Sequence, residues 1–347
     1  MAGRKKREGG QLTTKTYDHL GSVLFHYDLY PERVESFGKV SKIHTSRGIF
    51  ALKKTRLTRE EGDWFIHVMR RLDRIGFHYV VPIIQTKYGD FLVRRGNDAY
   101  YLMPWYEGHD RFQHPVSKED VILEETAKLH GLTEKNQDYS EEMIQASFDS
   151  LKGRWDRRKL EMERFADQAE SSMYMSPFEL TFLTHFQRMI QMAEAAEEHL
   201  ESWVEMCKEK KAFRSVLCHG RLNRSHVLFD QYGSGYFLNF ERAVLDTPAR
   251  ELAILFRHYF QSQPWDTSEG IHWLGTYERH FSLFDEERHL LMSYLAFPES
   301  VFHSVDLYIN EQRERTQLQL VTHLERRILS LNRTYRLMNT LFQEPQE

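Results

Sequence analysis

The chain has few cysteines, no long apolar run and little net charge. Its two cysteines, Cys207 and Cys218, form no CxxC or clustered-ligand spacing. This spacing indicates neither a disulfide framework nor a zinc ribbon, and reduced thiols in a cytosolic compartment fit better. No apolar stretch approaches the roughly twenty residues that span a bilayer. The 47 basic and 51 acidic residues give a net charge of −4, which does not indicate a general binder of nucleic acid or membrane surfaces.

The amino-terminal segment is basic and carries no targeting pattern. Residues 4–7 read RKKR and are followed by EGG, with no apolar run behind them. An ordinary secretory signal is therefore excluded, and no signal peptide is expected. Residues 1–12 are predicted to form a disordered basic tail, because a solvated tail is the commoner role of such a segment than an arm for an acidic partner.

The sequence does contain enough apolar material for a large core. Of its 347 residues, 41% are hydrophobic and 13% aromatic, and this length exceeds the usual single domain, so two lobes are expected. Short alternating apolar stretches between residues 34 and 54 predict a hairpin. Thr58 and Glu61 form a capping-box pattern, and the helix that follows ends at Gly76. Further strands are predicted at 80–84, 91–94 and 100–105.

From Ser117 onward the apolar period is 3.6 residues, which predicts a mainly helical second part. Helices are predicted at 118–130, 141–169, 177–211, 247–259, 286–296 and 313–341. Strands are predicted at 215–217, 227–229 and 236–238. This order of elements predicts an α+β arrangement, with an N-lobe over residues 13–105 and a helical C-lobe over residues 106–347. Several unrelated α+β folds share this order.

One segment carries a specific motif. Residues 218–230 read CHGRLNRSHVLFD, and residues 237–241 read FLNFE after a hairpin turn. The spacing, the flanking apolar residues and the turn resemble the catalytic segment of aminoglycoside phosphotransferases and related small-molecule kinases. In that family the loop HGDxxxxN is followed by a strand, a hairpin and a second motif with Asp. The resemblance covers about residues 35–260 and implies a bilobal protein-kinase-like fold, with a small β-rich N-lobe and a larger helical C-lobe.

Other segments resemble the nucleotide-binding parts of that family. Lys53 resembles the phosphate-binding lysine, and Glu61 is the nearest candidate for its glutamate partner. A segment of this sequence that includes Met103, Pro104 and Tyr106 resembles the hinge that contacts adenine in the family. Two alternatives stay open. Lys53 and Lys54 point to opposite faces of a strand, so a one-residue slip exchanges their roles, and the capping box explains Glu61 without a nucleotide.

The residues that perform phosphoryl transfer in the family are replaced here. Arg221 stands at the place of the catalytic Asp, His226 at that of the metal-binding Asn, and Asn239 at that of the metal-binding Asp. Arginine only donates hydrogen bonds, so Arg221 can neither accept a proton nor coordinate a cation. Relative to the family pattern, the change to Arg adds two positive charges and the change to Asn adds one, which makes the cleft three units more positive. No metal site and no cofactor are expected, and magnesium binding in particular is not expected. Proline keeps its carbonyl, so the hinge leaves ATP binding open.

The remaining motif residues are expected to brace the loop. The resemblance implies that His219 bonds toward Glu251, which lies in the segment PARELA (248–253) that resembles the family's PxxDLA. Leu129 and His130 resemble its LH helix end. A metal cluster of Cys218, His219 and His226 is not expected, because their spacing matches no common zinc pattern.

Among kinase-like proteins, three features resemble the bacterial spore-coat group that includes CotS, YutH and YsxE, with YsxE-like proteins as the nearest suggestion. They are the altered loop, the segment at 76–84 and the LMPWYEG hinge at 102–108. The resemblance implies a protein of the mother-cell cytoplasm and the spore coat, with other spore-coat proteins as partners and neither a nucleic acid nor a membrane span.

These observations favour a pseudokinase that acts as a non-catalytic structural or binding module in coat assembly. Loss of a general base costs roughly 10² to 10⁴ in rate, and loss of the metal removes further transition-state stabilisation. The alternative is an active small-molecule phosphotransferase, like the aminoglycoside or choline kinases, with an unusual site in which Glu241 or Asp246 supplies the carboxylate. ATP turnover by the purified protein distinguishes the two.

Overall fold

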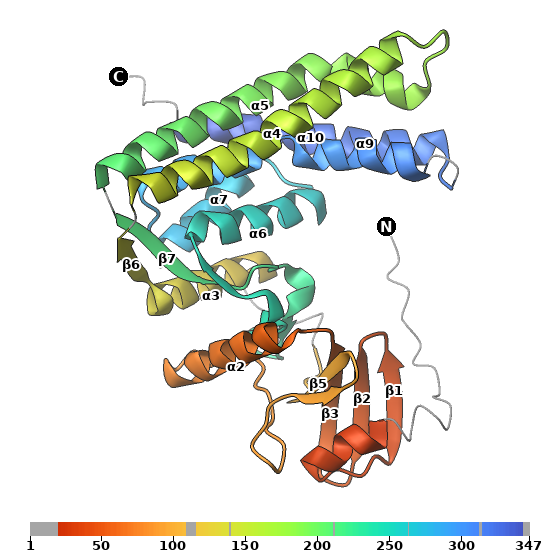
Figure 1. The fold of residues 1–347 in the computed structure, drawn as a ribbon, viewed down its shortest axis with the longest axis vertical. Helices are drawn as coiled ribbons and strands as arrows, with labels where there is room; N and C mark the ends of the chain where they lie inside the picture. The colour runs from red at the N-terminus through yellow and green to blue at the C-terminus, as the bar shows by residue number, and fades with distance from the viewer. Residues whose placement is uncertain are drawn as a thin grey trace. The chain divides into compact units, whose positions relative to one another are not determined.

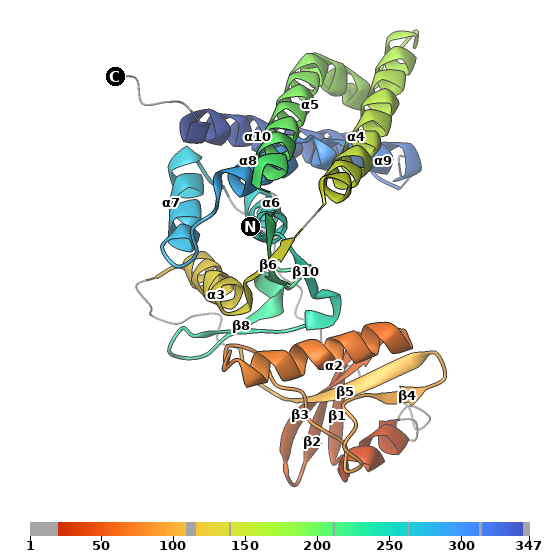
Figure 2. The same ribbon diagram turned by 60° about the vertical axis from the view of Figure 1, so that its left-hand side comes forward.

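The computed structural model describes residues 20–108, 116–138, 140–210, 212–262, 264–311 and 314–342. The predicted basic tail, residues 1–12, lies outside this part of the chain. The chain divides into two compact units. The first contains the described residues up to Glu125 together with Arg224–Ala243, and the second contains Thr126–Asn223 and Val244–Glu347. Figure 1 and Figure 2 show the strand-rich first unit and the helical second unit.

The first unit is built on a five-stranded antiparallel sheet with the order β1-β2-β3-β5-β4. The chain enters it through a short 3₁₀ helix, η1 (Phe25–Tyr27). Successive side chains of a strand point to opposite faces, and in the central strands β3 and β5 both faces are largely buried. One face packs on apolar side chains from residues 20–29 to form a core. The strands are β1 (Arg33–Phe37), β2 (Val40–Thr45), β3 (Gly48–Thr55), β4 (Val93–Arg95) and β5 (Asp98–Pro104).

Helix α2 (Arg59–Arg74) lies along one face of this sheet (Figure 1). The predicted capping box is confirmed: Glu61 N donates to Thr58 Oγ1 at 3.2 Å, and Thr58 N donates to Glu61 Oε2 at 2.9 Å. The helix buries an apolar stripe, from which Phe65 packs on Tyr101 of β5 with ring centroids 5.1 Å apart. The ion-rich opposite face is exposed, so the helix is amphipathic as its sequence spacing indicates.

The predicted strand at 80–84 is wrong. This segment forms only two isolated bridges, Val80 with Phe237 and Ile84 with Leu102. Pro82 has no N–H to donate and interrupts a ladder at this point. The bridge at Val80 joins residues 224–243 to the first unit, because Val81 N donates to Phe237 O at 2.9 Å and Phe237 N donates to Tyr79 O at the same distance.

Residues 224–243 therefore belong to the first unit, although the sequence places them in the larger lobe. They contain two short 3₁₀ helices, η2 (Arg224–His226) and η3 (Phe240–Arg242). Between them lies the hairpin of β8 (Val227–Phe229) and β9 (Gly235–Phe237). Asp230 shapes its turn, since its Oδ1 accepts from the backbone N–H groups of Tyr232 and Ser234 at 2.8 and 2.9 Å.

The second unit is helical around a small antiparallel sheet of order β10-β7-β6. The long helices α4 and α5 lie side by side in both views (Figures 1 and 2). No helix among the described residues is long and apolar enough to cross a membrane. The strands are β6 (Lys135–Asp138), β7 (Ala212–Cys218) and β10 (Val244–Asp246). The helices are α3 (Lys118–Thr133), which begins in the first unit, α4 (Glu141–Glu170), α5 (Pro177–Lys210), α6 (Pro248–Ser262), α7 (Thr267–Glu278), α8 (Asp285–Ala296), α9 (Glu299–Glu311) and α10 (Gln317–Phe342).

Two helices of this unit, α7 and α9, do not appear among the predicted elements, and α10 begins later than the predicted residue 313. Asp266 and Glu269 form a capping box at the start of α7, a signal that the sequence carries. At the start of α10, Thr316 Oγ1 accepts from Gln319 N at 3.2 Å while Gln319 Oε1 accepts from Thr316 N at 3.0 Å. This reciprocal cap sets the first turn of the helix.

Candidate functional site

The first unit places the predicted phosphate-binding lysine on the inner face of its sheet. Lys53 of β3 is paired in register with Tyr101 of β5, and it is only 8% exposed. The next residue, Lys54, points to the other face, where its Nζ lies 2.6 Å from Asp98 Oδ2 and its side chain is 46% exposed. The strand register therefore makes Lys53 the buried lysine of the pair and Lys54 the exposed one.

Three polar side chains surround Lys53. Together with it they form a group that we call the Lys53 cluster: Lys53, Tyr101, Asn239 and Glu241. Lys53 Nζ lies 2.9 Å from Glu241 Oε1 and also donates to Asn239 Oδ1. The Tyr101 hydroxyl donates to Glu241 Oε1 at 2.9 Å. Both polar side chains of the second motif, Asn239 and Glu241, therefore contact Lys53.

Local backbone geometry explains how the second motif reaches Lys53. Asn239 has φ 68° and ψ 43°, the left-handed conformation, and it directly precedes η3. Asparagine tolerates this region better than other residues with a Cβ. The sharp change of direction starts the 3₁₀ turn that carries Glu241. The loop is held at its far end by Trp64 of α2, whose Nε1 donates to Ala243 O at 2.7 Å.

The electrostatics of the Lys53 cluster favour an ion pair with a neutral phenol beside it. Burial raises the pKa of Tyr101 well above its usual range, and the neighbouring Glu241 carboxylate adds to this effect. Tyr101 therefore stays a hydrogen-bond donor. Both oxygens that face the lysine are acceptors for its ammonium group, so a cation at this point has to displace the Lys53 amine.

Glu61, the predicted nearest partner of Lys53, instead caps α2 as described above. Its Oε1 also lies 3.7 Å from Arg242 Nη1. The carboxylate that pairs with Lys53 is Glu241, which the sequence offers only as a substitute base. The reason is tertiary: η3 brings Glu241 over the sheet, whereas the cap holds Glu61 at the helix terminus.

The predicted hinge residues lie at and beyond the end of β5. Met103 is buried within the strand, and the strand ends at Pro104. Tyr106 stacks on Tyr236 of β9, with ring centroids 5.8 Å apart and an interplanar angle of 17°. Backbone pairing continues past the strand, since Trp105 N donates to Ile49 O at 3.0 Å.

The second unit holds the start of the altered loop. Gly220, with φ 76°, follows β7, and its N–H donates to Glu251 Oε2 at 2.9 Å. The His219 ring accepts from Arg221 N through Nδ1 at 3.3 Å. Both residues predicted to brace the loop therefore contact its main-chain N–H groups.

Glu251 is fully buried at this position. Burial raises its pKa to about 7, while the backbone N–H groups of Gly220, Leu222 and His219 act in the opposite direction. The Glu251 carboxylate thus contacts the loop even though its side chain is one methylene longer than that of the family's aspartate. The second carboxylate oxygen, Oε1, has no hydrogen-bond partner among the described residues.

The three replaced catalytic positions are divided between the units. Arg221 lies in the second unit with an exposed side chain, whereas His226 and Asn239 lie in the first. Asp246, a candidate for the missing carboxylate, pairs with Arg250 through Oδ2 and accepts from Thr247 N at 2.7 Å through Oδ1.

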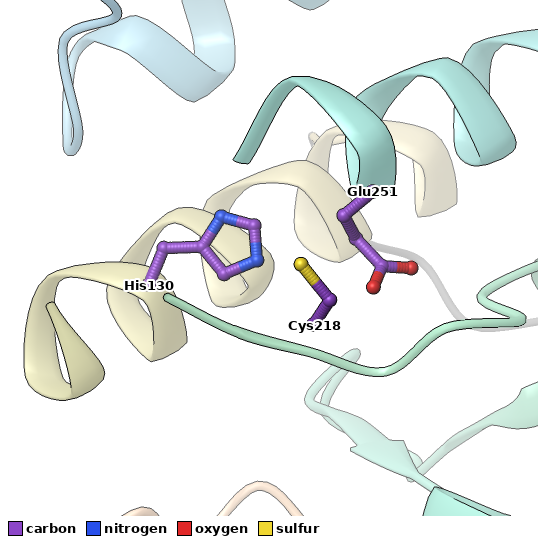
Figure 3. A group of neighbouring side chains, drawn as sticks. All are labelled: His130, Cys218 and Glu251. Carbon is purple, nitrogen blue, oxygen red and sulfur yellow. The ribbon is translucent and has the colours of Figure 1, made fainter. Parts of the chain in front are cut away.

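One neighbour of the loop was not foreseen. His130 of α3 lies beside Cys218 and Glu251, and a ligand atom of each lies within 4.8 Å of the others (Figure 3). From the sequence, Cys218 is considered only together with His219 and His226, for which no metal cluster is expected, and His226 belongs to the first unit. The leucine-histidine pair at 129–130 was the available signal.

The fold is that of the aminoglycoside phosphotransferases, a protein-kinase-like class. An aminoglycoside phosphotransferase from Alicyclobacillus acidocaldarius matches with a TM-score of 0.77 at 16% identity, over 98% of each chain. A spectinomycin phosphotransferase bound to AMP matches with a TM-score of 0.58 at 14% identity, over 92% of this chain and 98% of the other. An amicoumacin kinase in complex with AMP-PNP and Ca²⁺ matches with a TM-score of 0.55 at 13% identity, over 92% and 93%.

A family model described as "Spore coat putative kinase YutH" matches residues 22–341. The chain therefore belongs to this family, and the predicted spore-coat group and fold class are confirmed. No curated protein sequence matches the chain.

Proposed function

We propose that this protein is a pseudokinase of the spore coat, which acts as a non-catalytic binding or structural module in coat assembly. Membership of the spore-coat kinase family supports the location, and the Lys53 cluster supports the loss of catalysis. The observation that carries the proposal is that the lysine expected to hold nucleotide phosphates is committed to Glu241 and Asn239.

The chemistry of the replaced positions points the same way. Magnesium prefers carboxylate and phosphate oxygens in an octahedral shell. Asn239 supplies one neutral oxygen, which already accepts from Lys53, and His226 supplies nitrogen. At the position of the base, Arg221 offers only donors. Positioning and charge neutralisation provide nearly all of the catalysis in phosphoryl transfer. The replaced residues weaken both of these contributions to catalysis.

The test is ATP turnover and nucleotide-dependent thermal shift with the purified full chain, in magnesium or manganese. We expect no steady release of γ-phosphate. A triple variant, Arg221→Asp with His226→Asn and Asn239→Asp, restores the family's oxygens and is expected to gain a metal-dependent shift in Tm with ATP. That gain shows that the assay detects a repaired site.

Wild-type turnover that disappears in Lys53→Met but persists in Lys54→Ala contradicts the proposal. Lys54 is the matched control, because it is the adjacent lysine on the outer face of the same strand. Turnover equal in both variants identifies a contaminating activity and leaves the expected absence of catalysis standing.

A fluorescent fusion followed through sporulation tests the location. We expect the fusion to appear in the mother cell and then around the developing spore. Uniform expression in vegetative cells, with no signal at the spore surface, argues against a coat role whatever the result of the turnover assay.

The second candidate function is an active phosphotransferase, and one observation favours it. Asp246 and Thr247 line a cavity of about 460 Å³ within the second unit, together with Arg154 and Tyr294. A carboxylate beside a cavity is a candidate base. Asp246→Asn separates the functions: loss of a measured turnover supports the enzyme, whereas no turnover in either protein supports the pseudokinase.

A further inference from the structure

Three ligating side chains from distant parts of the sequence converge in the interior of the second unit. His130 comes from α3, Cys218 from the end of β7 and Glu251 from α6, and Figure 3 shows the Cys218 sulfur between the His130 ring and the Glu251 side chain. A nitrogen, a sulfur and an oxygen atom of this group all lie within 4.8 Å of one another. His130, Cys218 and Glu251 are each 0% exposed.

Two atoms of the group have no hydrogen-bond partner among the described residues. They are His130 Nε2 and Glu251 Oε1. Buried polar side-chain atoms are nearly always paired, and an unpaired one in a folded protein commonly marks an ion or a water. Two such atoms in one buried group, with a thiol beside them, indicate one shared ligand.

The other polar atoms of these side chains are held in place. His130 Nδ1 lies 2.6 Å from the Tyr277 hydroxyl, Glu251 Oε2 accepts from Gly220 N, and Cys218 Sγ lies 3.4 Å from Thr247 O. A metal-binding histidine usually donates its second ring N–H to an oxygen, which fixes the tautomer and leaves the other nitrogen free to ligate. Donation from Nδ1 to Tyr277 leaves the Nε2 lone pair for such a ligand.

We propose that His130, Cys218 and Glu251 bind one zinc ion. Zinc takes nitrogen, thiolate and carboxylate ligands at 2.0–2.3 Å, which places tetrahedral donors about 3.5 Å apart. Donor atoms that are now up to 4.8 Å apart therefore have to approach one another by at most about 1.3 Å. A thiolate and a carboxylate also neutralise the two charges of the ion, so the buried complex carries no net charge.

Binding of zinc to Cys218 requires the thiolate form of this side chain. A metal that binds a thiolate releases the thiol proton, which is the usual coupling of metal affinity to pH.

The zinc ion would stabilise the loop after β7. Glu251 Oε2 holds Gly220 N, so a metal on Oε1 fixes the same carboxylate from its other side. The ion ties α3, β7 and α6 together beneath the loop, a structural role that does not depend on phosphoryl transfer.

The experiment uses the untagged full chain, because it already contains 18 histidines. The chain is loaded with zinc, passed over a desalting column and analysed for metal by mass spectrometry. We expect one zinc per chain and a first shell of one sulfur with nitrogen and oxygen by X-ray absorption. Cobalt in its place is expected to give a thiolate charge-transfer band.

Three variants localise the site. Cys218→Ala is expected to lose the cobalt band, whereas Cys207→Ala, at the other buried cysteine, is expected to keep it. Tyr277→Phe removes only the partner of His130 Nδ1 and is expected to weaken zinc affinity about 10- to 100-fold.

The proposal is overturned by a zinc shell without sulfur or by substoichiometric zinc in the loaded wild-type chain. Both measurements need no variant, so a misfolded Cys218→Ala does not block the test.

Discussion

The two units treat their buried polar groups differently. In the Lys53 cluster each charge has a partner, and the Tyr101 hydroxyl is paired as well. In the group of His130, Cys218 and Glu251, two atoms have no partner among the described residues. The first arrangement is complete without a ligand, whereas the second lacks something that a ligand or a proton can supply. Replacement of the catalytic residues therefore does not mean that the second unit has no ligand-binding site.

The largest effect is expected from Glu241→Ala, which leaves the Lys53 ammonium buried without its carboxylate. Removing one partner of a buried ion pair costs about 3–5 kcal/mol, so the urea midpoint of the first unit should fall markedly. Lys53→Met combined with Glu241→Leu removes both charges and should recover most of this loss. Equal losses in the single and double variants would show that packing, and not charge, holds the cluster.

A smaller effect is expected from Tyr277→Phe in metal-free buffer. This change leaves the buried His130 ring without its Tyr277 partner and should cost about 1–3 kcal/mol. Tyr101→Phe is the matched change in the first unit, where Glu241 keeps its lysine, so a loss of only about 1 kcal/mol is expected. Denaturant titrations of both variants compare the units directly, and a larger loss for Tyr101→Phe reverses the comparison.

Acid should act on the second unit through histidines whose pKa is lowered by burial, among them His130 and His199, whose Nδ1 lies 2.9 Å from His289 Nδ1. Burial, with a smaller contribution from His289, lowers the pKa of His199 to about 4. The unfolded chain takes up this proton near pH 6.5, so the contribution to stability is full above 6.5 and is lost as the pH falls toward 4. His199→Gln should flatten Tm against pH in this window. An unchanged slope assigns the acid response to other groups.

The smallest effect is expected from Lys54→Ala. Its ion pair with Asp98 is exposed, and such pairs contribute about 0–1 kcal/mol. The variant should unfold at nearly the wild-type urea concentration, and added salt should narrow the remaining difference. A loss comparable with that of Glu241→Ala would mean that the two faces of β3 are not as different as their burial indicates.

Much of the fold follows from local pattern. The hairpin strands, the capping box of α2 and the long helices α4 and α5 lie close to their predicted bounds because apolar period and caps are local signals. The strand expected at 80–84 fails because Pro82 and long-range pairing decide that segment. The strands β6 and β10 are short and pair only with β7, so their own residues carry little signal.

The candidate site was predictable in its residue types but not in its contacts. Lys53, Asn239 and Glu241 stand in recognisable motifs, yet the pairing of Lys53 with Glu241 instead of Glu61 depends on a left-handed turn at Asn239. The place of His130 depends on how the end of α3 packs beside β7, where Leu217 N donates to Thr133 Oγ1, and no spacing between positions 130 and 218 encodes this packing.

The sequence by itself determined which groups this protein has: a motif segment with arginine and asparagine where the family has acids, and the apolar periods that form its strands and helices. Only the tertiary structure decided which of those groups meet. The physical reason is that side-chain charge and backbone propensity are local properties, whereas pairing and burial depend on segments brought together from more than a hundred residues apart, such as Lys53 with Glu241.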